Sequence, residues 1–250
     1  MTDLIKKIED LSLNAWPSHQ VQFYDGWILR YSNFYTHRTN SVEQLGLSCL
    51  PLREKVQFCE SIYRRWKTPC IFKITPLGDP ALDAFLEKRG YRIEHHTTVM
   101  TRHLDGPAGF PRPSCGLHFE NRVSRDWIDG LFRLKDMNDP FFAKIVPQMY
   151  DAIPMDEIAV SLPGEDGIGA TGLGILDRDS VGIYAIHVSP ALRRRGIARS
   201  MVCSILAEAS ARGADFAYLQ AVTDNTPARS LYRSCGFRDE YSYYFRVKEV

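Results

Sequence analysis

Apolar residues recur at helical spacing in the stretch that follows Gly196: Ile197, Met201, Ile205 and Leu206. This pattern predicts an amphipathic helix that runs to about Arg212, and the glycine after it is a plausible stop. Residues 181–188 form a short, mostly apolar run that predicts a strand before the helix, and residues 216–222 predict a strand after it. A short helix that ends at a glycine comes next. We therefore expect strand, helix, strand and helix in this part of the chain.

The residues from 117 onward add the elements that complete this half. Ser124 is a candidate N-cap for a helix with apolar side chains at Trp127, Leu131 and Leu134. Residues 140–153 are rich in aromatic side chains without a clean period, and we expect a loop or a broken helix there. The expected strands are residues 117–122, 157–162, 169–176 and 181–188, with a hairpin around Pro-Gly-Glu-Asp-Gly.

Residues 104–116 contain three prolines and three glycines. A segment of this composition is not a regular helix or strand, and it is the best candidate for a domain boundary. The sequence thus predicts an N-terminal domain at residues 1–103, a linker at residues 104–116 and a C-terminal domain at residues 117–250.

The N-terminal half begins with an amphipathic helix and not with a signal peptide. Residues 53–66 predict a second helix, whose apolar stripe is Val56, Cys59, Ile62, Tyr63 and Trp66. Residues 70–75 predict a strand after it. The same order of helix and strand occurs in the C-terminal half.

A short internal similarity follows that strand. When Gly90 is set against Gly236, Asp79 falls on Asn225 and Leu86 falls on Tyr232. The N-terminal half then looks like a degenerate copy of the C-terminal half, although chance similarity between two short helix–glycine–aromatic units also explains the match. The turn before the earlier helix, residues 48–55, has no glycine and only weak anion-binding character.

The turn between the apolar run and the C-terminal helix reads Arg193-x-x-Gly196-x-Ala198. Glycine lets backbone approach a ligand closely, and the first N–H groups of a helix have no partner within the helix. The helix dipole adds to the positive potential, and three consecutive arginines raise it further. The turn is therefore a candidate site for a phosphate or pyrophosphate. The alternative is a basic, solvated surface turn.

These residues resemble a signature of the GNAT acetyltransferases, which carry Arg/Gln-x-x-Gly-x-Gly/Ala in this setting. Residues 225–237 are similar to a second GNAT signature, Asn-x-x-Ala-x-x-Leu-Tyr-x-x-x-Gly-Phe. The two motifs stand in the order and at the distance found in that family. The resemblance implies an α/β mixed sheet, in a tandem GNAT arrangement with a degenerate N-terminal half and a complete C-terminal half.

The resemblance also implies acetyl-coenzyme A as co-substrate and residues that hold it. In the family, the turn binds the pyrophosphate, and the backbone of the preceding strand pairs with the pantetheine arm. The implied cofactor-binding residues are Ile186, His187, Val188, Arg193, Arg194, Arg195, Gly196, Ile197, Ala198, Arg199, Asn225 and Tyr232. Ile186 and Val188 have a second interpretation as core residues, and Asn225 either binds the cofactor or caps the short helix.

Tyr232 is implied as the general acid that protonates the departing thiolate, because a phenol with a pKa near 10 can donate to an alkyl thiolate. Its alternative role is a helix tyrosine packed on the sheet. Many GNAT enzymes carry a glutamate as base on the strand before the turn, but Gly182 occupies that position here and Tyr184 is next on the same face. An acceptor amine that arrives neutral would need no strong base.

Three carboxylates on the expected acceptor side are candidates for the base, namely Asp136, Asp139 and Glu157, although each also fits a helix cap or a solvated charge. The acceptor pocket is expected to involve the large apolar groups Met137, Phe141, Phe142, Met149 and Tyr150, which alternatively cover the sheet.

Residues 25–31 and 38–42 resemble the opening of a bacterial subgroup of two-part GNAT proteins. Residues 38–41 either form a turn or line a cleft shared by the halves.

Composition narrows the function further. The 250 residues carry a net charge of +1, which argues against a nucleic-acid or membrane partner. Six cysteines without a Cys-x-x-Cys pair indicate reduced thiols in a cytoplasmic protein, and no apolar run has transmembrane length. The histidines show no metal-ligand spacing, since His95 and His96 are adjacent in an expected strand, so no metal is predicted.

The functional prediction is an acetyl-CoA-dependent N-acetyltransferase that acts on a primary amine of a small molecule or protein, as a monomer or homodimer. The alternative is a catalytically silent CoA-binding sensor or an interaction scaffold. The missing strand carboxylate and the degenerate N-terminal copy favour that alternative.

Overall fold

The computed structural model describes residues 2–106, 110, 116–165 and 167–250. Part of the expected linker, residues 107–109 and 111–115, lies outside the described residues, as does Cys115. The other five cysteines carry free thiols. No helix in the described ranges is both long enough and apolar enough to cross a membrane.

The C-terminal half has the element order that its sequence pattern predicts: strand, two helices, three strands, helix, strand, helix and strand. Its elements are β6 (His118–Glu120), α4 (Arg125–Leu134), α5 (Pro140–Asp151), β7 (Asp156–Gly164), β8 (Gly167–Asp177), β9 (Ser180–Val188), η3 (Pro190–Leu192), α6 (Ile197–Ala211), β10 (Phe216–Val222), α7 (Thr226–Ser234) and β11 (Arg238–Lys248). Ser124 caps α4 as expected, because its side chain accepts a hydrogen bond from the Trp127 backbone N–H.

The N-terminal half repeats the second part of this order. Its elements are α1 (Thr2–Ala15), β1 (Gln20–Tyr24), β2 (Trp27–Tyr31), η1 (His37–Thr39), β3 (Val42–Gln44), α2 (Leu52–Trp66), β4 (Cys70–Ile74), α3 (Pro80–Lys88) and β5 (Arg92–His103). The proposed internal similarity has a structural counterpart. Asp79 caps α3 as Asn225 caps α7, and Gly90 and Gly236 both adopt left-handed backbone, at φ 82° and 85°.

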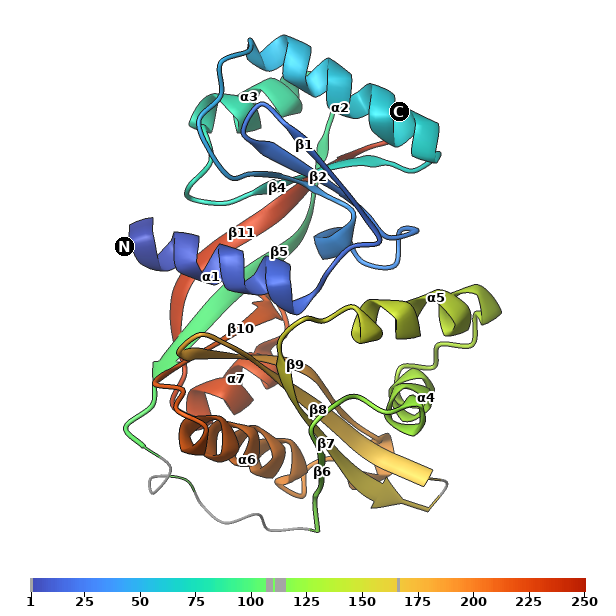
Figure 1. Ribbon diagram of the computed structural model, residues 1–250, viewed down its shortest axis with the longest axis vertical. Coiled ribbons are helices and arrows are strands. Elements are labelled where there is room, and N and C mark those ends of the chain that lie inside the picture. The colour runs from blue at the N-terminus through green and yellow to red at the C-terminus, as the bar shows by residue number, and fades with distance from the viewer. Residues whose placement is uncertain (1, 107–109, 111–115, 166) are drawn as a thin grey trace.

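The two halves share one mixed sheet of eleven strands in the order β1-β2-β3-β4-β11-β5-β10-β9-β8-β7-β6. The order shows an exchange at the centre: β11, from the C-terminal half, lies between β4 and β5, and β5 separates β11 from β10. The two exchanged strands pair antiparallel from Arg238 to Val247 of β11. Figure 1 shows them as the green and red ribbons that cross from one half to the other. Each half-sheet is therefore completed by a strand of the other half.

Helices cover both faces of this sheet (Figure 1). In the C-terminal half, alternate residues of β7 point to opposite cores: Ile158 and Val160 pack with α6, whereas Ala159 packs with α4 and α5. Helices α2 and α3 cover the N-terminal strands. Helix α1 packs its apolar stripe on the central strands and reaches the other half through Asn14, whose side-chain amide donates to Asp177.

One element differs from the sequence expectation. Residues 140–153 were expected to form a loop or a broken helix, but Pro140–Asp151 is one helix that contains Pro147. Asp139 caps it by accepting from the Phe141 backbone N–H, and Pro140 occupies the first turn, where a missing N–H costs nothing. Its buried side chains face the core formed with α4, so tertiary packing outweighs the irregular pattern.

A buried network of charged side chains joins α1 to the strands of the N-terminal half. The Lys73 ammonium, on β4, donates to the Glu9 carboxylate of α1 and lies 3.4 Å from Glu43 Oε2 on β3. Arg30 Nη1 lies 3.7 Å from Glu43 Oε1, and the Tyr241 hydroxyl of β11 donates to Glu9. All of these side chains are nearly inaccessible, so each charge depends on its partners.

We predict that Lys73→Met lowers the free energy of unfolding by about 3–5 kcal/mol at pH 7, as expected when one partner of a buried ion pair is removed. The change leaves Glu9 and Glu43 buried together without their shared cation. The loss shrinks as the pH falls, because burial raises the pKa of Glu43 and its protonation removes the repulsion. Urea unfolding measures the effect, with exposed Lys144→Met as the matched control. Equal stability of the two variants would contradict the prediction.

Candidate functional site

The basic turn lies between β9 and α6 and has an unusual backbone. Gly196 is the N-cap of α6 at φ 76°, and Arg194 also has positive φ, at 65°. A Cβ built on Gly196 meets no atom within 4 Å, so the space over the turn is open. Glycine is required here by the backbone angle and leaves room for a ligand at the same position.

The backbone N–H groups of residues 194–199 are available to such a ligand. The first backbone bond into the helix is from Ser200 N–H to the Gly196 carbonyl, at 2.9 Å. Among the described residues, none of the six preceding N–H groups donates to a backbone carbonyl. Arg193 Nε donates to the Val188 carbonyl at 3.2 Å and fixes the turn against the end of β9. Open N–H groups at the positive end of a 15-residue helix form an anion site.

The strand that leads into this turn separates from its neighbour. Strands β9 and β10 pair in parallel only as far as Ile183 and Leu219, and the remaining residues of β9 have no partner on that side. Ala185, at φ 48°, marks a bulge where the β8–β9 register shifts. The bulge and the separation leave the backbone of Ile186 and Val188 open toward the gap between the strands.

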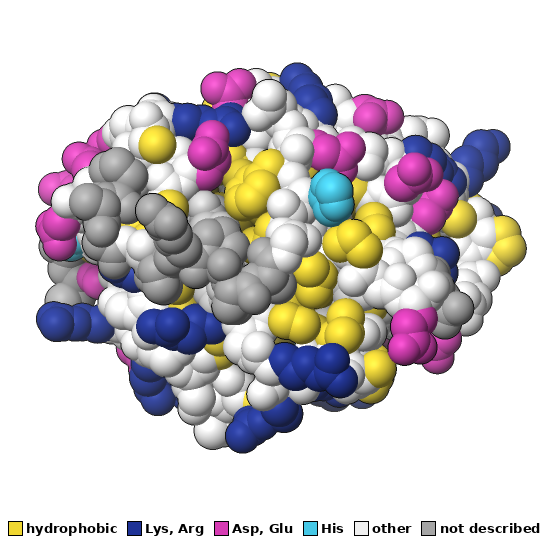
Figure 2. All heavy atoms as spheres, turned by 90° about the horizontal axis from the view of Figure 1, so that it is seen from below, with side chains coloured by type: hydrophobic (Ala, Val, Ile, Leu, Met, Phe, Trp, Pro, Cys, Tyr) yellow, Lys and Arg dark blue, Asp and Glu magenta, His cyan; other side chains and the backbone are white. Residues whose placement is uncertain are grey.

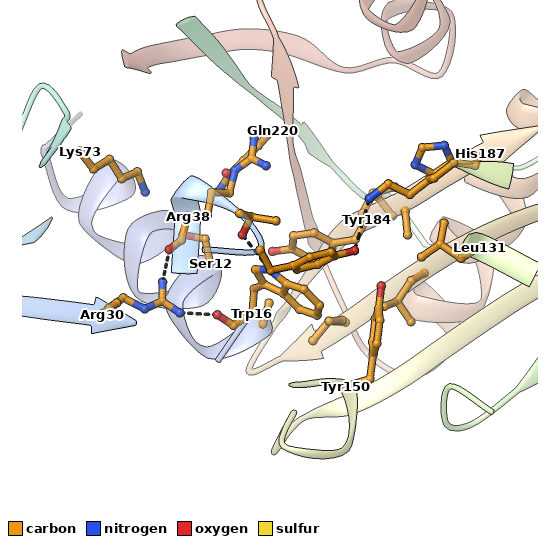
Figure 3. A pocket seen from close by; sticks show the side chains of 18 of the residues that line it. Ser12, Trp16, Arg30, Arg38, Lys73, Leu131, Tyr150, Tyr184, His187 and Gln220 are labelled. Atoms are coloured by element: carbon orange, nitrogen blue, oxygen red, sulfur yellow. Dashed lines mark hydrogen bonds between the residues drawn. The ribbon is translucent and has the colours of Figure 1, made fainter. Parts of the chain in front are cut away.

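A cavity of about 220 Å³ lies beside this gap, between the two halves of the protein. The C-terminal half contributes, among others, Tyr150, Tyr184, His187 and Tyr232, and the N-terminal half contributes Trp16, Arg30, Tyr35, Arg38, Glu43 and Lys73. Figure 3 shows His187 at one end and Lys73 and Arg38 toward the other. Arg38 therefore lines a space shared by the halves, whereas its neighbours Thr39, Asn40 and Ser41 are fully buried.

Tyr232, on α7, lines the cavity as well as packing on the core. Its ring meets Phe237 edge-on, with centroids 6.2 Å apart, and no hydrogen bond is recorded for its hydroxyl within the described residues. Burial raises its pKa to about 12. The phenol consequently stays protonated through the physiological pH range and keeps a proton to donate.

Gly182, the position at which the sequence resemblance leads one to look for a glutamate, lies against two tyrosines. A Cβ on Gly182 would lie 2.6 Å from the Tyr184 ring and 2.7 Å from the Tyr218 hydroxyl. The two hydroxyls are hydrogen-bonded at 2.7 Å, and burial raises the pKa of both. A larger side chain at Gly182 would collide with this pair, so the glycine is a packing requirement.

His187 projects into the cavity from β9, whereas the sequence resemblance gave it only as one of the implied cofactor-binding residues. Burial, with Lys135 and Arg193 as further causes, lowers its pKa to about 4. The imidazole is therefore neutral at physiological pH and has a nitrogen that can accept a hydrogen bond. Lys135, at the end of α4, lies 3.4 Å from the Tyr35 hydroxyl and adds a positive charge near the cavity.

The carboxylates considered as bases lie outside the cavity lining. Glu157 is buried on β7, where it accepts from the Val123 backbone N–H at 2.7 Å and lies 3.5 Å from Arg122. Asp139 caps α5, and Asp136 is exposed and accepts from Asn138. Asp139 and Asp136 thus match the alternatives of a helix cap and a solvated charge, whereas Glu157 is neither, because it is buried on its strand. Among the described residues that line the cavity, Glu43 is the one carboxylate, and it is already paired with two cations.

The remaining expected site residues have mixed positions. Asn225 accepts from the Ala228 backbone N–H and so caps α7. Tyr150 reaches the cavity, Phe142 packs on Tyr35 with centroids 5.3 Å apart, and Phe141 is half exposed. The cavity residues that sequence reasoning missed include Trp16, Tyr35, Glu43, Lys73, Lys135 and Gln220. No local motif marks them, because the fold brings them together from both halves.

Three residues of metal-ligand type meet outside this cavity. Ligand atoms of His37, Glu94 and His95 all lie within 4.8 Å of one another, and His37 Nε2 is 3.2 Å from Glu94 Oε2. A bulge in β5, with His95 at φ 52°, disrupts the regular strand alternation. Such a set could hold a metal ion. Spacing along the chain did not indicate it, because His37 is 57 residues from Glu94.

The surface around the lower half carries charges of both signs. Figure 2 shows basic and acidic side chains spread over this face, with apolar side chains exposed between them.

Known proteins resemble this chain along nearly its full length. A sequence model of the family described as probable histone acetyltransferase Rv0428c C-terminal matches residues 2–246. An uncharacterized N-acetyltransferase, YobR, of Bacillus subtilis (strain 168) is 23% identical over 249 residues, which cover 98% of this chain and 99% of the relative.

Two solved structures share the fold. A GCN5-related N-acetyltransferase from Kribbella flavida superposes with a TM-score of 0.70 and 12% identity, over 98% of this chain and 95% of that one. A tandem GNAT protein from the clavulanic acid biosynthesis pathway has a TM-score of 0.70 and 11% identity, over 97% and 87%. The predicted α/β GNAT fold is confirmed, and a tandem GNAT protein shares it.

We predict that His187 stays neutral down to about pH 4, because its buried site disfavours the imidazolium. The unfolded chain binds that proton near pH 6.5, so this residue makes the fold less stable as the pH falls from 6.5 to 4. NMR titration of the imidazole measures the pKa, with His187→Gln used to assign the signal. Lys135→Gln should raise the pKa toward 6.5. A pKa near 6.5 for His187 in the wild-type protein would contradict the prediction.

Proposed function

Because the chain belongs to the family described as probable histone acetyltransferase Rv0428c C-terminal, and is an acetyltransferase of GNAT type, we propose that it transfers an acetyl group from acetyl-CoA to a primary amine. The observation that carries the proposal is the continuity of one strand. β9 joins the open N–H groups of residues 194–199 to the cavity that contains the Tyr232 hydroxyl.

The co-substrate would be held by backbone at both ends of this strand. The N–H groups of residues 194–199 fit a pyrophosphate, and Arg193, Arg194, Arg195 and Arg199 supply positive charge around it. The Ile186 backbone and the Val188 N–H, which face the gap between β9 and β10, would bind the pantetheine arm, as in the family that the sequence resembles, while the Val188 carbonyl accepts from Arg193. The N–H groups of Ile186 and Val188 can also polarise the thioester carbonyl when that carbonyl lies over the gap between β9 and β10.

Acetyl transfer then needs a neutral amine and a protonated leaving group. The amine nitrogen attacks the thioester carbonyl carbon, the carbon–sulfur bond breaks, and the thiolate takes the Tyr232 proton. The acylated nitrogen, left with one proton too many, loses it to the Tyr232 phenolate directly or through solvent, so that the amide, free CoA and the phenol are the products. Lys135 places positive charge at the His187 end of the cavity, which lowers the pKa of a bound ammonium. The amine would thus lose its proton without a strong base, and the neutral His187 imidazole can accept a hydrogen bond from it.

The cavity limits the size of the acceptor. About 220 Å³ enclosed by both halves admits a small amine or one side chain of a protein, but not a folded surface. The family description names a histone acetyltransferase, so a protein lysine is one candidate acceptor for this chain.

A catalytically silent CoA sensor is the alternative. The observation in its favour is that the one carboxylate lining the cavity, Glu43, is already paired with Arg30 and Lys73. Binding of acetyl-CoA without transfer to any amine would support that alternative.

We predict that the protein binds one acetyl-CoA per chain and that Gly196→Glu weakens this binding at least 100-fold. The new carboxylate would occupy the open space over the turn and repel the pyrophosphate. Isothermal titration calorimetry measures both quantities. Gly90→Glu is the matched control, since Gly90 has similar backbone, at φ 82°, and equally open surroundings. Unchanged binding to Gly196→Glu would exclude the turn as the site.

We predict that Tyr232→Phe lowers kcat by about 10²-fold while the Kd for acetyl-CoA changes less than about threefold, because the hydroxyl acts on the leaving thiolate. Steady-state kinetics with the best amine of a broad panel measure the effect. Tyr24→Phe, on the surface strand β1, keeps its stacking on Phe58 and serves as control. An undiminished kcat in Tyr232→Phe would remove the phenol from the mechanism.

A further inference from the structure

The end of the cavity farthest from His187 contains an unpaired cation. Arg30 and Lys73 both lie there, but each is paired with Glu43. Arg38 also lines this end, and within the described residues no carboxylate lies within 4.0 Å of its guanidinium. Its recorded side-chain hydrogen bond uses Nε, which donates to the Tyr243 hydroxyl at 2.7 Å. The two Nη groups therefore keep their hydrogens for a ligand.

A second donor lies beside it. Gln220, on β10, lines the same cavity, and its Nε2 is a buried nitrogen without a hydrogen-bond partner within the described residues. An amide N–H₂ in this situation is costly unless something accepts its hydrogens. Figure 3 shows Gln220 on the Arg38 side of the cavity, away from His187.

Tyr243 sets the orientation of both groups. Its hydroxyl accepts from Arg38 Nε, so its own single hydrogen is free to donate, and Gln220 Oε1 accepts it at 2.7 Å. This bond holds the amide oxygen toward Tyr243 and leaves Nε2 without an acceptor among the described residues. The Arg38 Nη groups and the Gln220 Nε2 group are thus N–H donors without acceptors among the described residues, and the guanidinium adds a positive charge.

From this arrangement we propose that Arg38 and Gln220 form an anion subsite for the acceptor, so that the preferred substrate is a primary amine that also carries a carboxylate. The inference rests on the proposed acetyl transfer for the role of the amine. The carboxylate would accept from the Arg38 Nη groups and from Gln220 Nε2, which satisfies the buried nitrogen. The amine would then point toward His187 and Tyr232.

The rest of the cavity fits such a molecule. Trp16, Tyr35, Tyr150 and Tyr184 provide apolar walls between the two ends, and they suit an aliphatic chain that separates an amine from a carboxylate. A phosphonate or phosphate offers the same oxyanion chemistry, and the experiment separates these sources by using both.

The first measurement is calorimetric binding of matched amines to the wild-type chain, without turnover. The probes are 6-aminohexanoate, hexylamine and 6-aminohexylphosphonate, with the shorter homologues 4-aminobutanoate and butylamine. We expect each amino acid to bind at least tenfold more tightly than its alkylamine. If each amino acid bound no more tightly than its alkylamine, the proposed subsite would be wrong. If 6-aminohexylphosphonate bound more tightly than 6-aminohexanoate, the preferred anion would be a phosphorus oxyanion and not a carboxylate.

Two variants test the assigned residues. Arg38→Gln should remove the preference by weakening the amino acid about tenfold or more and leaving the alkylamine unchanged. Gln220→Glu can still accept from Tyr243 but pairs with Arg38, and it should also remove the preference without unfolding the chain. Arg65→Gln, an exposed change on α2, is the control. A preference that survives in both cavity variants would refute the assignment.

Steady-state kinetics separate this inference from the proposed function. For acetyl transfer, Arg38→Gln should raise KM for the amino acid with little change in kcat. Carboxylate-selective binding with no transfer to any amine would support the subsite and contradict the acetyltransferase proposal. Transfer to all amines with equal kcat/KM would support the acetyltransferase proposal and contradict the subsite.

Discussion

The antiparallel pairing of β5 with β11 is the interaction on which the rest of the structure depends. Each strand belongs to one half of the chain and lies next to the strands of the other, so the halves cannot separate without breaking the centre of the sheet. The cavity is lined by residues of both halves, and its shape is therefore fixed by the sheet rather than by docking of two surfaces. The buried charges of Glu9, Glu43 and Lys73 then attach α1 below this junction, and Asn14 and Lys7 of the same helix reach the β8–β9 turn.

Local patterns in the sequence predicted the elements that local physics determines. The strand at residues 216–222 and the helix that follows Gly196 occur as predicted, because side-chain period and a glycine at positive φ specify them over a few residues. The cavity was out of reach of such reasoning. Its key contact joins Arg38 to Tyr243, 205 residues away, and the unpaired state of Gln220 Nε2 is a property of the folded surroundings alone. Helix α5 was missed because its irregular apolar pattern is stabilised by packing on α4.

The cavity also explains why the strand carries no carboxylate base. Tyr184 and Tyr218 fill the space beside Gly182, so a larger side chain there would collide with them. The burial that raises the pKa of Tyr184 would also disfavour an ionised carboxylate at this position. The charges that remain near the cavity are mostly positive, and they act on the amine by disfavouring its ammonium form. The site thus combines a neutral imidazole, a protonated phenol and unpaired cations in place of an acid–base carboxylate.

The exchanged strands have a consequence for biosynthesis. Among the described strands β11 is synthesised after all the others, yet its place is between β4 and β5, which are made much earlier. Until it arrives, those two strands each present an open edge, and an open edge in a nascent chain is a template for wrong pairing with other chains. The N-terminal half therefore cannot finish folding as it emerges. The cavity between the halves forms only after β11 has emerged, and a ribosome that stops before residue 238 releases a chain without it.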